Sequence, residues 1–232
     1  MGQQIDQLDT TIAGVLVTVD ARAVLVHSTR PLHVLSSALA HGGFATTHSV
    51  VNMHVDDVAP GSSPQAELAA FALQAGVDDG SVGLMTAAAT QHARLAVARD
   101  GGLTVASVVS VGLSNATRAG ITPPAPFAPG TINAIVLVDG RLSDAAMVNA
   151  VITATEAKTA VLAEWDVRAA GGEAATGTST DAVVIACSPS GRPLPYAGPA
   201  TPVGHLVART VHDAIDRVCR EKVARDGGRI GW

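Results

Sequence analysis

The residues best suited to chemistry gather between positions 130 and 181. Glu156 and Lys158 lie close together in an apolar run, and Thr178 and Asp181 follow in a loop of glycine and hydroxyl residues. A carboxylate held away from water can act as a general acid or base, and a hydroxyl beside a base can act as a nucleophile. Burying such groups without partners costs roughly 1 to 3 kcal/mol each, so a chain that keeps them pairs or uses them. We therefore expect acid–base or nucleophilic chemistry in this stretch.

A long helix should carry Glu156 and Lys158. Ser143 and Asp144 can cap its start, and the run to about Trp165 is apolar on nearly every side, which predicts a largely buried helix. The two charged residues lie about 200° apart around such a helix, so we do not expect them to pair with each other. Two interpretations of Glu156 stay open: a solvated charge at the helix edge, or a desolvated general base.

A strand before this helix and a loop after it should complete a polar pocket. The strand from Thr131 to Val138 places Thr131 and Asn133 on one face. The loop that includes Thr176 and Gly177 leads into an apolar strand, and its backbone N–H groups and hydroxyls can bind an anion, a carbonyl oxygen or an amide. It lacks the Gly-x-x-x-x-Gly-Lys-Ser/Thr pattern of a phosphate-binding loop.

Two further strand ends could supply binding residues. Alternation in a strand from His48 to Val55 puts His48, Asn52 and His54 on one face, but nothing supplies a clear third ligand, so we expect no metal site in the protein. The strand from Leu103 to Val111 ends in a loop of small and hydrogen-bonding residues, which is typical of binding loops and also of plain turns. The candidates in that loop are Ser114, Asn115 and Arg118.

Composition excludes several classes of protein. The chain of 232 residues has a net charge of −5 and only 3% aromatic residues, which argues against a nucleic-acid partner. No apolar run approaches the ~18 to 20 residues that span a bilayer, and the start of the sequence lacks a signal-peptide pattern, so we expect a cytoplasmic protein with no membrane contact. The two cysteines, Cys187 and Cys219, have no metal-binding spacing.

The pattern of elements predicts an α+β fold with a mainly antiparallel β-sheet and about three helices in a single compact domain. The helices should run from Pro64 to about Ala75, from Asp144 to about Trp165, and from Pro202 to about Ala224. The domain should span residues 11–225, with a flexible N-terminus over 1–10 and a flexible tail over 226–232. The proline-rich stretch at 123–129 should be a stiff connection inside this domain.

Several segments, in one order, resemble the adenosylcobinamide amidohydrolase (CbiZ) family over about residues 11 to 220. They are Leu35-Ser-Ser-Ala38, Asn52 with His54, Val82-Gly-Leu-Met-Thr86, Val111-Gly-Leu-Ser-Asn115 with Arg118-Ala-Gly120, Pro129-Gly-Thr-Ile-Asn133, the helix stretch Asn149 to Thr159, Ala175-Thr-Gly-Thr-Ser-Thr-Asp181, and Tyr196-Ala-Gly198. One departure is Ser179, where the family's run has glycine. Serine disfavours a positive φ, which puts the loop geometry in question.

The resemblance implies a corrinoid-salvage enzyme. Such enzymes hydrolyse the amide that joins the aminopropanol arm to the corrin ring of adenosylcobinamide, giving adenosylcobyric acid and aminopropanol for cobalamin biosynthesis. The partner would be a small-molecule corrinoid that carries its own cobalt, with no separate cofactor, and a homo-oligomer is left open. The alternative is a non-catalytic corrinoid-binding or storage protein.

Two mechanisms fit amide hydrolysis. In the first, Glu156 is the base for water, and Lys158 or Asp181 orients groups or protonates the leaving amine. In the second, Thr178 or Ser114 is a covalent nucleophile. In either mechanism the remaining polar residues would hydrogen-bond the substrate or contact the peripheral amides of the corrin. They are Asn52, His54, Ser114, Asn115, Arg118, Thr131, Asn133, Thr176 and Gly177.

Overall fold

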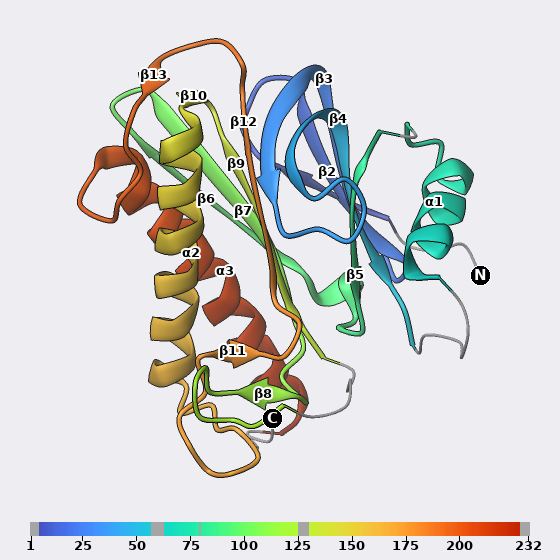
Figure 1. Cartoon of the computed structure of the whole chain (residues 1–232), viewed down its shortest axis with the longest axis vertical. Coiled ribbons are helices and arrows are strands. Elements are labelled where there is room, and N and C mark those ends of the chain that lie inside the picture. Colours follow the sequence, from blue (N-terminus) through green and yellow to red (C-terminus); the bar gives the residue numbers. More distant parts are fainter. Residues whose placement is uncertain (1–4, 57–62, 79, 125–129, 228–232) are drawn as a thin grey trace.

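A computed structural model describes residues 5–56, 63–78, 80–124 and 130–227 as a curved sheet with two long helices against one face (Figure 1). The helices of the described residues are α1 (Pro64–Gln74), α2 (Asp144–Glu164), α3 (Pro202–Arg225) and the short 3-10 helix η1 (Thr90–His92). The predicted α+β class with about three α-helices, in a single compact domain, is confirmed.

The main sheet is mostly antiparallel, as predicted, and its strands follow the order β1-β2-β3-β12-β9-β7-β6. Two of its pairs are parallel, β12 with β9 and β4 with β5. The strands are β1 (Asp6–Asp9), β2 (Val15–Val19), β3 (Ala23–Ser36), β4 (Gly43–His54), β5 (Val82–Thr86), β6 (Arg94–Asp100), β7 (Leu103–Val111), β9 (Ile132–Val138) and β12 (Ala182–Cys187).

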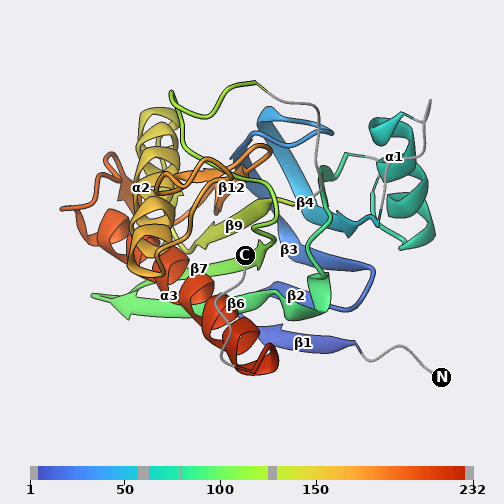
Figure 2. The same ribbon diagram turned by 90° about the horizontal axis from the view of Figure 1, so that it is seen from below.

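Strand β3 makes the sheet curl. It pairs with β4 along its length, while β2 pairs with its first half and β12 with its second half. A register shift between His27 and Leu32 joins the halves, so Arg30 and Pro31 lie at an irregularity within one continuous strand. The sheet thereby folds into a nearly closed, barrel-like shape, with β4 on the side away from α2 (Figure 2) and β5 beside it (Figure 1).

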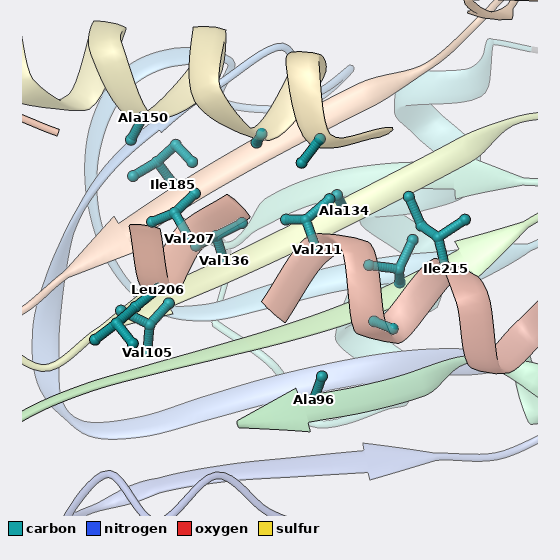
Figure 3. Packing of buried hydrophobic residues seen from close by; sticks show 14 of the residues in the cluster. Ala96, Val105, Ala134, Val136, Ala150, Ile185, Leu206, Val207, Val211 and Ile215 are labelled. Atoms are coloured by element: carbon teal, nitrogen blue, oxygen red, sulfur yellow. The ribbon is translucent and has the colours of Figure 1, made fainter. Parts of the chain in front are cut away.

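Alternation along β9 explains the two main hydrophobic layers. Ile132, Ala134 and Val136 belong to the layer beneath α2 and α3, part of which is drawn in Figure 3, whereas Ile135 and Leu137 belong to the layer inside the curled sheet. All seven residues of β9 are buried. The alternation that was predicted to put Thr131 and Asn133 on one face extends to Ile135 and Leu137, and the packing confirms it for these two.

Helix α2 differs from its prediction. The hydroxyl of Ser143 accepts a hydrogen bond from the backbone N–H of Ala146, as expected for an N-cap. The prediction of a largely buried helix is wrong on one face, however, because α3 and the sheet cover only the other side. Val148 and Ile152 are 47% and 50% exposed there, and Glu156 is exposed as well.

The ends of the chain also refine the sequence reading. Residues 6–9, assigned to a flexible N-terminus, form β1, which pairs with β2. Residues 125–129 of the proline-rich connection and 228–232 of the tail lie outside the described residues. No helix in the described ranges is long and apolar enough to cross a membrane.

Two short strands were not predicted, and they matter most for the site. β8 (Ala116–Thr117) and β11 (Gly177–Thr178) pair antiparallel beside the lower end of α2 (Figure 1). A second small pair, β10 (Arg141–Leu142) with β13 (Pro193–Leu194), lies at the opposite end of the molecule (Figure 1).

Candidate active site

The β8–β11 pair brings together two loops that lie about sixty residues apart in the sequence. Thr117 pairs with Gly177 and Ala116 with Thr178, and the backbone N–H of Thr176 donates to the carbonyl of Thr117 over 2.9 Å. Because β9 and β12 are parallel, their first residues meet at the same edge of the sheet. The polar segments at 114–118, 130–133 and 176–181 therefore meet there.

Asp181 is the centre of a buried charged cluster at this edge. Its carboxylate forms an ion pair with Lys158 of α2, and the two side chains are only 12% and 11% exposed. It also accepts a hydrogen bond from the hydroxyl of Thr178, and its oxygens lie 3.1 Å from the backbone nitrogen of Thr178 and 3.0 Å from that of Ile132. The sequence expectation that Lys158 pairs with a residue other than Glu156 is confirmed.

Gly177 leaves the room for this cluster. A Cβ atom at position 177 would lie 2.3 Å from Asp181 Oδ2 and 2.7 Å from Lys158 Nζ, which is closer than real Cβ contacts come. Gly177 does not have a positive φ, so the close approach of the ion pair, and not backbone conformation, requires glycine there. Gly177 therefore shapes the cluster without supplying a side chain.

A second group of polar residues lies on the opposite, inner face of the sheet. The Asn133 amide donates to Asn52 Oδ1 over 2.8 Å and to the carbonyl of Met85 over 2.9 Å, and the Asn52 amide donates to Ser110 Oγ over 3.0 Å. The hydroxyl of Thr131 lies 3.1 Å from Asn133 Oδ1. Asn52, Ser110 and Asn133 are each 1% exposed, and this network links β4, β7 and β9 across the interior.

A cavity of about 230 Å³ lies between this network and the loop of the charged cluster. Asn133 and Thr131 line it on one side and Gly130 and Thr180 on another, while most of the remaining wall is apolar, including Leu39, Leu84 and Met85. The Thr180 hydroxyl donates to the Gly130 carbonyl over 2.8 Å. Thr180 directly precedes Asp181, so the cavity and the charged cluster share one loop, although Lys158, Thr178 and Asp181 do not themselves line the cavity.

The remaining loop candidates surround this edge. The Asn115 amide donates to the Gly130 carbonyl and to the Ser179 hydroxyl, both over 2.7 Å. Thr176 accepts from the Ala119 N–H over 3.0 Å, and Arg118 is exposed and donates to the Ala174 carbonyl over 3.2 Å. Ser114 is exposed at the start of the same segment.

Ser179 does not disturb the loop. The described non-glycine residues with a positive φ are Thr11, His41 and Asp166, so serine at 179 meets no backbone penalty. Its hydroxyl instead accepts the hydrogen bond from Asn115. The question that the serine raised about loop geometry is answered.

Two candidates lie apart from the charged cluster. Glu156 is exposed on α2, so the desolvation on which its assignment as a base depends is absent. His54 is half-buried at the end of β4, where Nδ1 lies 3.0 Å from the carbonyl of Ala88 and Nε2 lies 3.3 Å from Asp56 Oδ1. Asp56 lines the cavity, which puts His54 near its mouth. In the ranges that the structure describes, no three His, Cys, Asp or Glu side chains gather as a metal site.

Sequence reasoning missed the cavity itself. Thr180 and Ser37 line it, yet neither was a candidate, because a mainly apolar cavity has no short motif. The available signal was the position of Thr180 in the sequence, directly before Asp181 and at the end of the hydroxyl-rich Thr-Gly-Thr-Ser-Thr run. The partner strand that brings Ser37 close could not be read from the sequence.

The family described as "Adenosylcobinamide amidohydrolase" matches this sequence over residues 9–227. The chain belongs to this family. The match contains every segment just described, from Asn52 to the loop ending at Asp181.

Two relatives carry the name adenosylcobinamide amidohydrolase. The one from Halobacterium salinarum is 40% identical over 169 residues, which are 69% of this chain and 68% of that protein. The one from Methanosarcina mazei is 33% identical over 184 residues, which are 75% of this chain and 84% of that protein. Both support hydrolysis of an amide of cobinamide as the family's activity.

A solved structure shares the fold at low sequence identity. The crystal structure of the PH0078 protein from Pyrococcus horikoshii OT3 superimposes with a TM-score of 0.51 and 12% identity, covering 88% of this chain and 79% of that one. At this identity the likeness concerns the fold alone.

Proposed function

We propose that this protein hydrolyses the amide between the aminopropanol arm and the corrin ring of adenosylcobinamide, releasing adenosylcobyric acid and aminopropanol for cobalamin biosynthesis. The observation that carries this proposal is the buried Lys158–Asp181–Thr178 cluster on the loop that also walls the cavity. Family membership supplies the class of substrate, and the cluster supplies groups that amide hydrolysis needs.

Thr178 is the nucleophile in this proposal. Its hydroxyl already donates to Asp181, which is the arrangement of a nucleophile beside its base. Thr178 Oγ1 attacks the amide carbonyl carbon as its proton passes to Asp181. The C–N bond then breaks, and the leaving amine takes that proton, which leaves an ester on Thr178. Water hydrolyses the ester, and the Thr178 hydroxyl is restored.

Lys158 holds Asp181 in place for both halves of this reaction. The ammonium contacts Asp181 Oδ2, while the Thr178 hydroxyl contacts Oδ1, so the base keeps one oxygen for each partner. Lys158 and Asp181 are mostly shielded from water, so the positive charge of Lys158 also stabilises negative charge that develops beside Thr178 in the transition state of this proposal. Glu156, exposed on α2, has no part in this mechanism.

The size of the cavity supports entry by one arm of the substrate. A cavity of about 230 Å³ is smaller than the roughly 300 to 1,000 Å³ typical of pockets that enclose whole ligands. The macrocycle therefore stays outside, and the short aminopropanol arm enters between Leu39 and the wall formed by Gly130 and Thr180.

Incubating the purified protein with adenosylcobinamide tests the function. We expect adenosylcobyric acid and aminopropanol to accumulate over many turnovers, as measured by mass spectrometry. Hydroxylamine added during turnover should give the cobyric hydroxamate, because it captures the ester on Thr178. A non-catalytic corrinoid-binding protein would return the substrate unchanged, and that result would overturn the proposal.

A further inference from the structure

A second, larger groove adjoins the cavity. It has a volume of about 840 Å³ and lies between α1, β5 and the loop at residues 39–41. Leu39 lines both the groove and the cavity, so the two are neighbours. Leu39 and Leu73, which also lines the groove, are 49% and 80% exposed. The groove therefore offers an apolar surface of a size suited to a whole ligand.

His41 gives this groove a group that can bind a metal. Its Nδ1 lies 2.9 Å from the backbone carbonyl of Ser81. A carbonyl oxygen only accepts hydrogen bonds, so Nδ1 must carry the proton, and in the neutral ring Nε2 keeps its lone pair. Metal-binding histidines usually have this arrangement: one ring nitrogen donates a hydrogen bond to a carbonyl or carboxylate, and the other nitrogen binds the metal.

The loop that carries His41 is held in one position. Ala40 and Gly83 exchange two backbone hydrogen bonds, of 3.1 and 3.0 Å. Behind them, a Cβ at Gly42 would lie 2.5 Å from the carbonyl oxygen of Ala38, so the turn accepts only glycine. His41 itself has φ of 53°, a strained conformation of the kind that clusters at functional sites. The ring is therefore positioned before any ligand arrives.

We propose that the groove binds the corrin macrocycle with His41 Nε2 as an axial ligand of its cobalt. The aminopropanol arm then passes Leu39 into the cavity, whose wall at Thr180 adjoins Asp181. In this step the Co–N bond to His41 replaces the bond from cobalt to an axial water, the water leaves, and the oxidation state of cobalt is unchanged. The inference rests on the proposed function for the identity of the ligand.

Other histidines share the ring geometry but not the location. His48 Nδ1 lies 2.9 Å from the Ser28 carbonyl and His54 Nδ1 lies 3.0 Å from that of Ala88. His54 Nε2 already contacts Asp56, and neither ring lines the groove. A hydrogen bond from Nδ1 to a carbonyl is therefore not enough to identify a cobalt ligand. The ring must also line a groove that can hold the macrocycle, and of these three histidines only His41 does.

Visible spectroscopy with aquacobinamide, which has exchangeable axial water, tests the proposal. The wild-type protein should shift the visible bands of aquacobinamide toward those of its imidazole complex. His41→Asn is the matched variant, because its amide can still donate to Ser81 and asparagine tolerates positive φ, but it lacks the imidazole. It should lose the shift and bind at least about tenfold more weakly. His205→Ala, on the exposed side of α3, should behave as wild type.

Electron paramagnetic resonance of the bound cob(II)inamide identifies the ligand atom. An axial ¹⁴N ligand splits each cobalt line into three, and protein labelled with ¹⁵N-histidine should give two. An unsplit spectrum, no binding, or unchanged splitting in His41→Asn would overturn the inference. Product formation without any spectral shift would refute His41 ligation and leave the hydrolase proposal standing. A spectral shift without product would refute the hydrolase proposal and leave His41 ligation of the corrinoid standing.

Discussion

Lys158 on α2 and Asp181, the residue directly before β12, form an ion pair whose side chains are only 11% and 12% exposed. The pair joins the helix layer to the loop that walls the cavity. Desolvating two charges is expensive, and a single ion pair offsets that loss only when further hydrogen bonds assist it. Thr178 and the backbone N–H of Ile132 provide this assistance.

Removing Lys158 should destabilise the protein strongly. Lys158→Met leaves the Asp181 carboxylate buried without its cation, and we expect a loss of about 3 to 5 kcal/mol in the free energy of unfolding, measured by urea denaturation. The double variant Lys158→Met/Asp181→Asn should be less destabilised than the sum of the single variants, because no unpaired charge remains. Additive losses would show that the two residues do not interact.

Gly177→Ala should damage the site more than the fold. The new methyl group would occupy the space of the ion pair, and a displacement near 1 Å at a reacting group lowers turnover by about a hundredfold. Gly80→Ala is the matched control, since Gly80 also lacks a positive φ and nothing lies within 4 Å of its added Cβ. Equal activity in the two variants would contradict this role of Gly177.

The Asn52–Asn133 pair should show energetic coupling. Asn133→Ala leaves Asn52 Oδ1 without its donor in the interior, which we expect to lower stability by about 1 to 3 kcal/mol. Asn52→Ala should act similarly on the Asn133 amide. The double variant should lose less than the sum of both, and thermal or urea unfolding of the four proteins measures the difference. Strict additivity would mean that the network contributes nothing as a unit.

Both thiols should resist modification in the folded protein. Burial, with a smaller contribution from Asp216, raises the pKa of Cys219 to about 12, and burial also raises the pKa of Cys187. Because the thiolate is the reactive form, raising the pH from 7 to 9 should barely increase labelling by iodoacetamide. Unfolding in urea should expose two thiols, or one in Cys219→Ser. Rapid labelling of the native protein would contradict this prediction.

The sequence predicted local features better than the meeting of distant ones. Periodicity placed β7 at Leu103–Val111 and β9 to within one residue of Ile132–Val138, and it separated Lys158 from Glu156 on α2. Those features depend on neighbours in the chain. The register that joins β8 to β11 and the curl that sets β5 across from β9 depend on tertiary packing, and no local pattern encodes them.

Helix α2 illustrates the same limit. Alanine, valine and isoleucine on nearly every side give no direction of burial, so the sequence could not say that Ile152 and Glu156 face outward. Only the positions of α3 and the sheet decide which side is covered. Exposure therefore leaves Glu156 without the desolvation that a buried base has, whereas the Asp181 side chain is mostly buried.

The rate at which Thr178→Val releases aminopropanol from adenosylcobinamide, compared with that of Glu156→Gln, tests the central claim most directly. Valine keeps the shape of threonine and removes only the hydroxyl. With folding and corrinoid binding verified for both, we predict that Thr178→Val loses at least about a thousandfold in rate, while Glu156→Gln stays near wild type. Near-normal turnover by Thr178→Val, or a comparable loss in Glu156→Gln, would contradict the account.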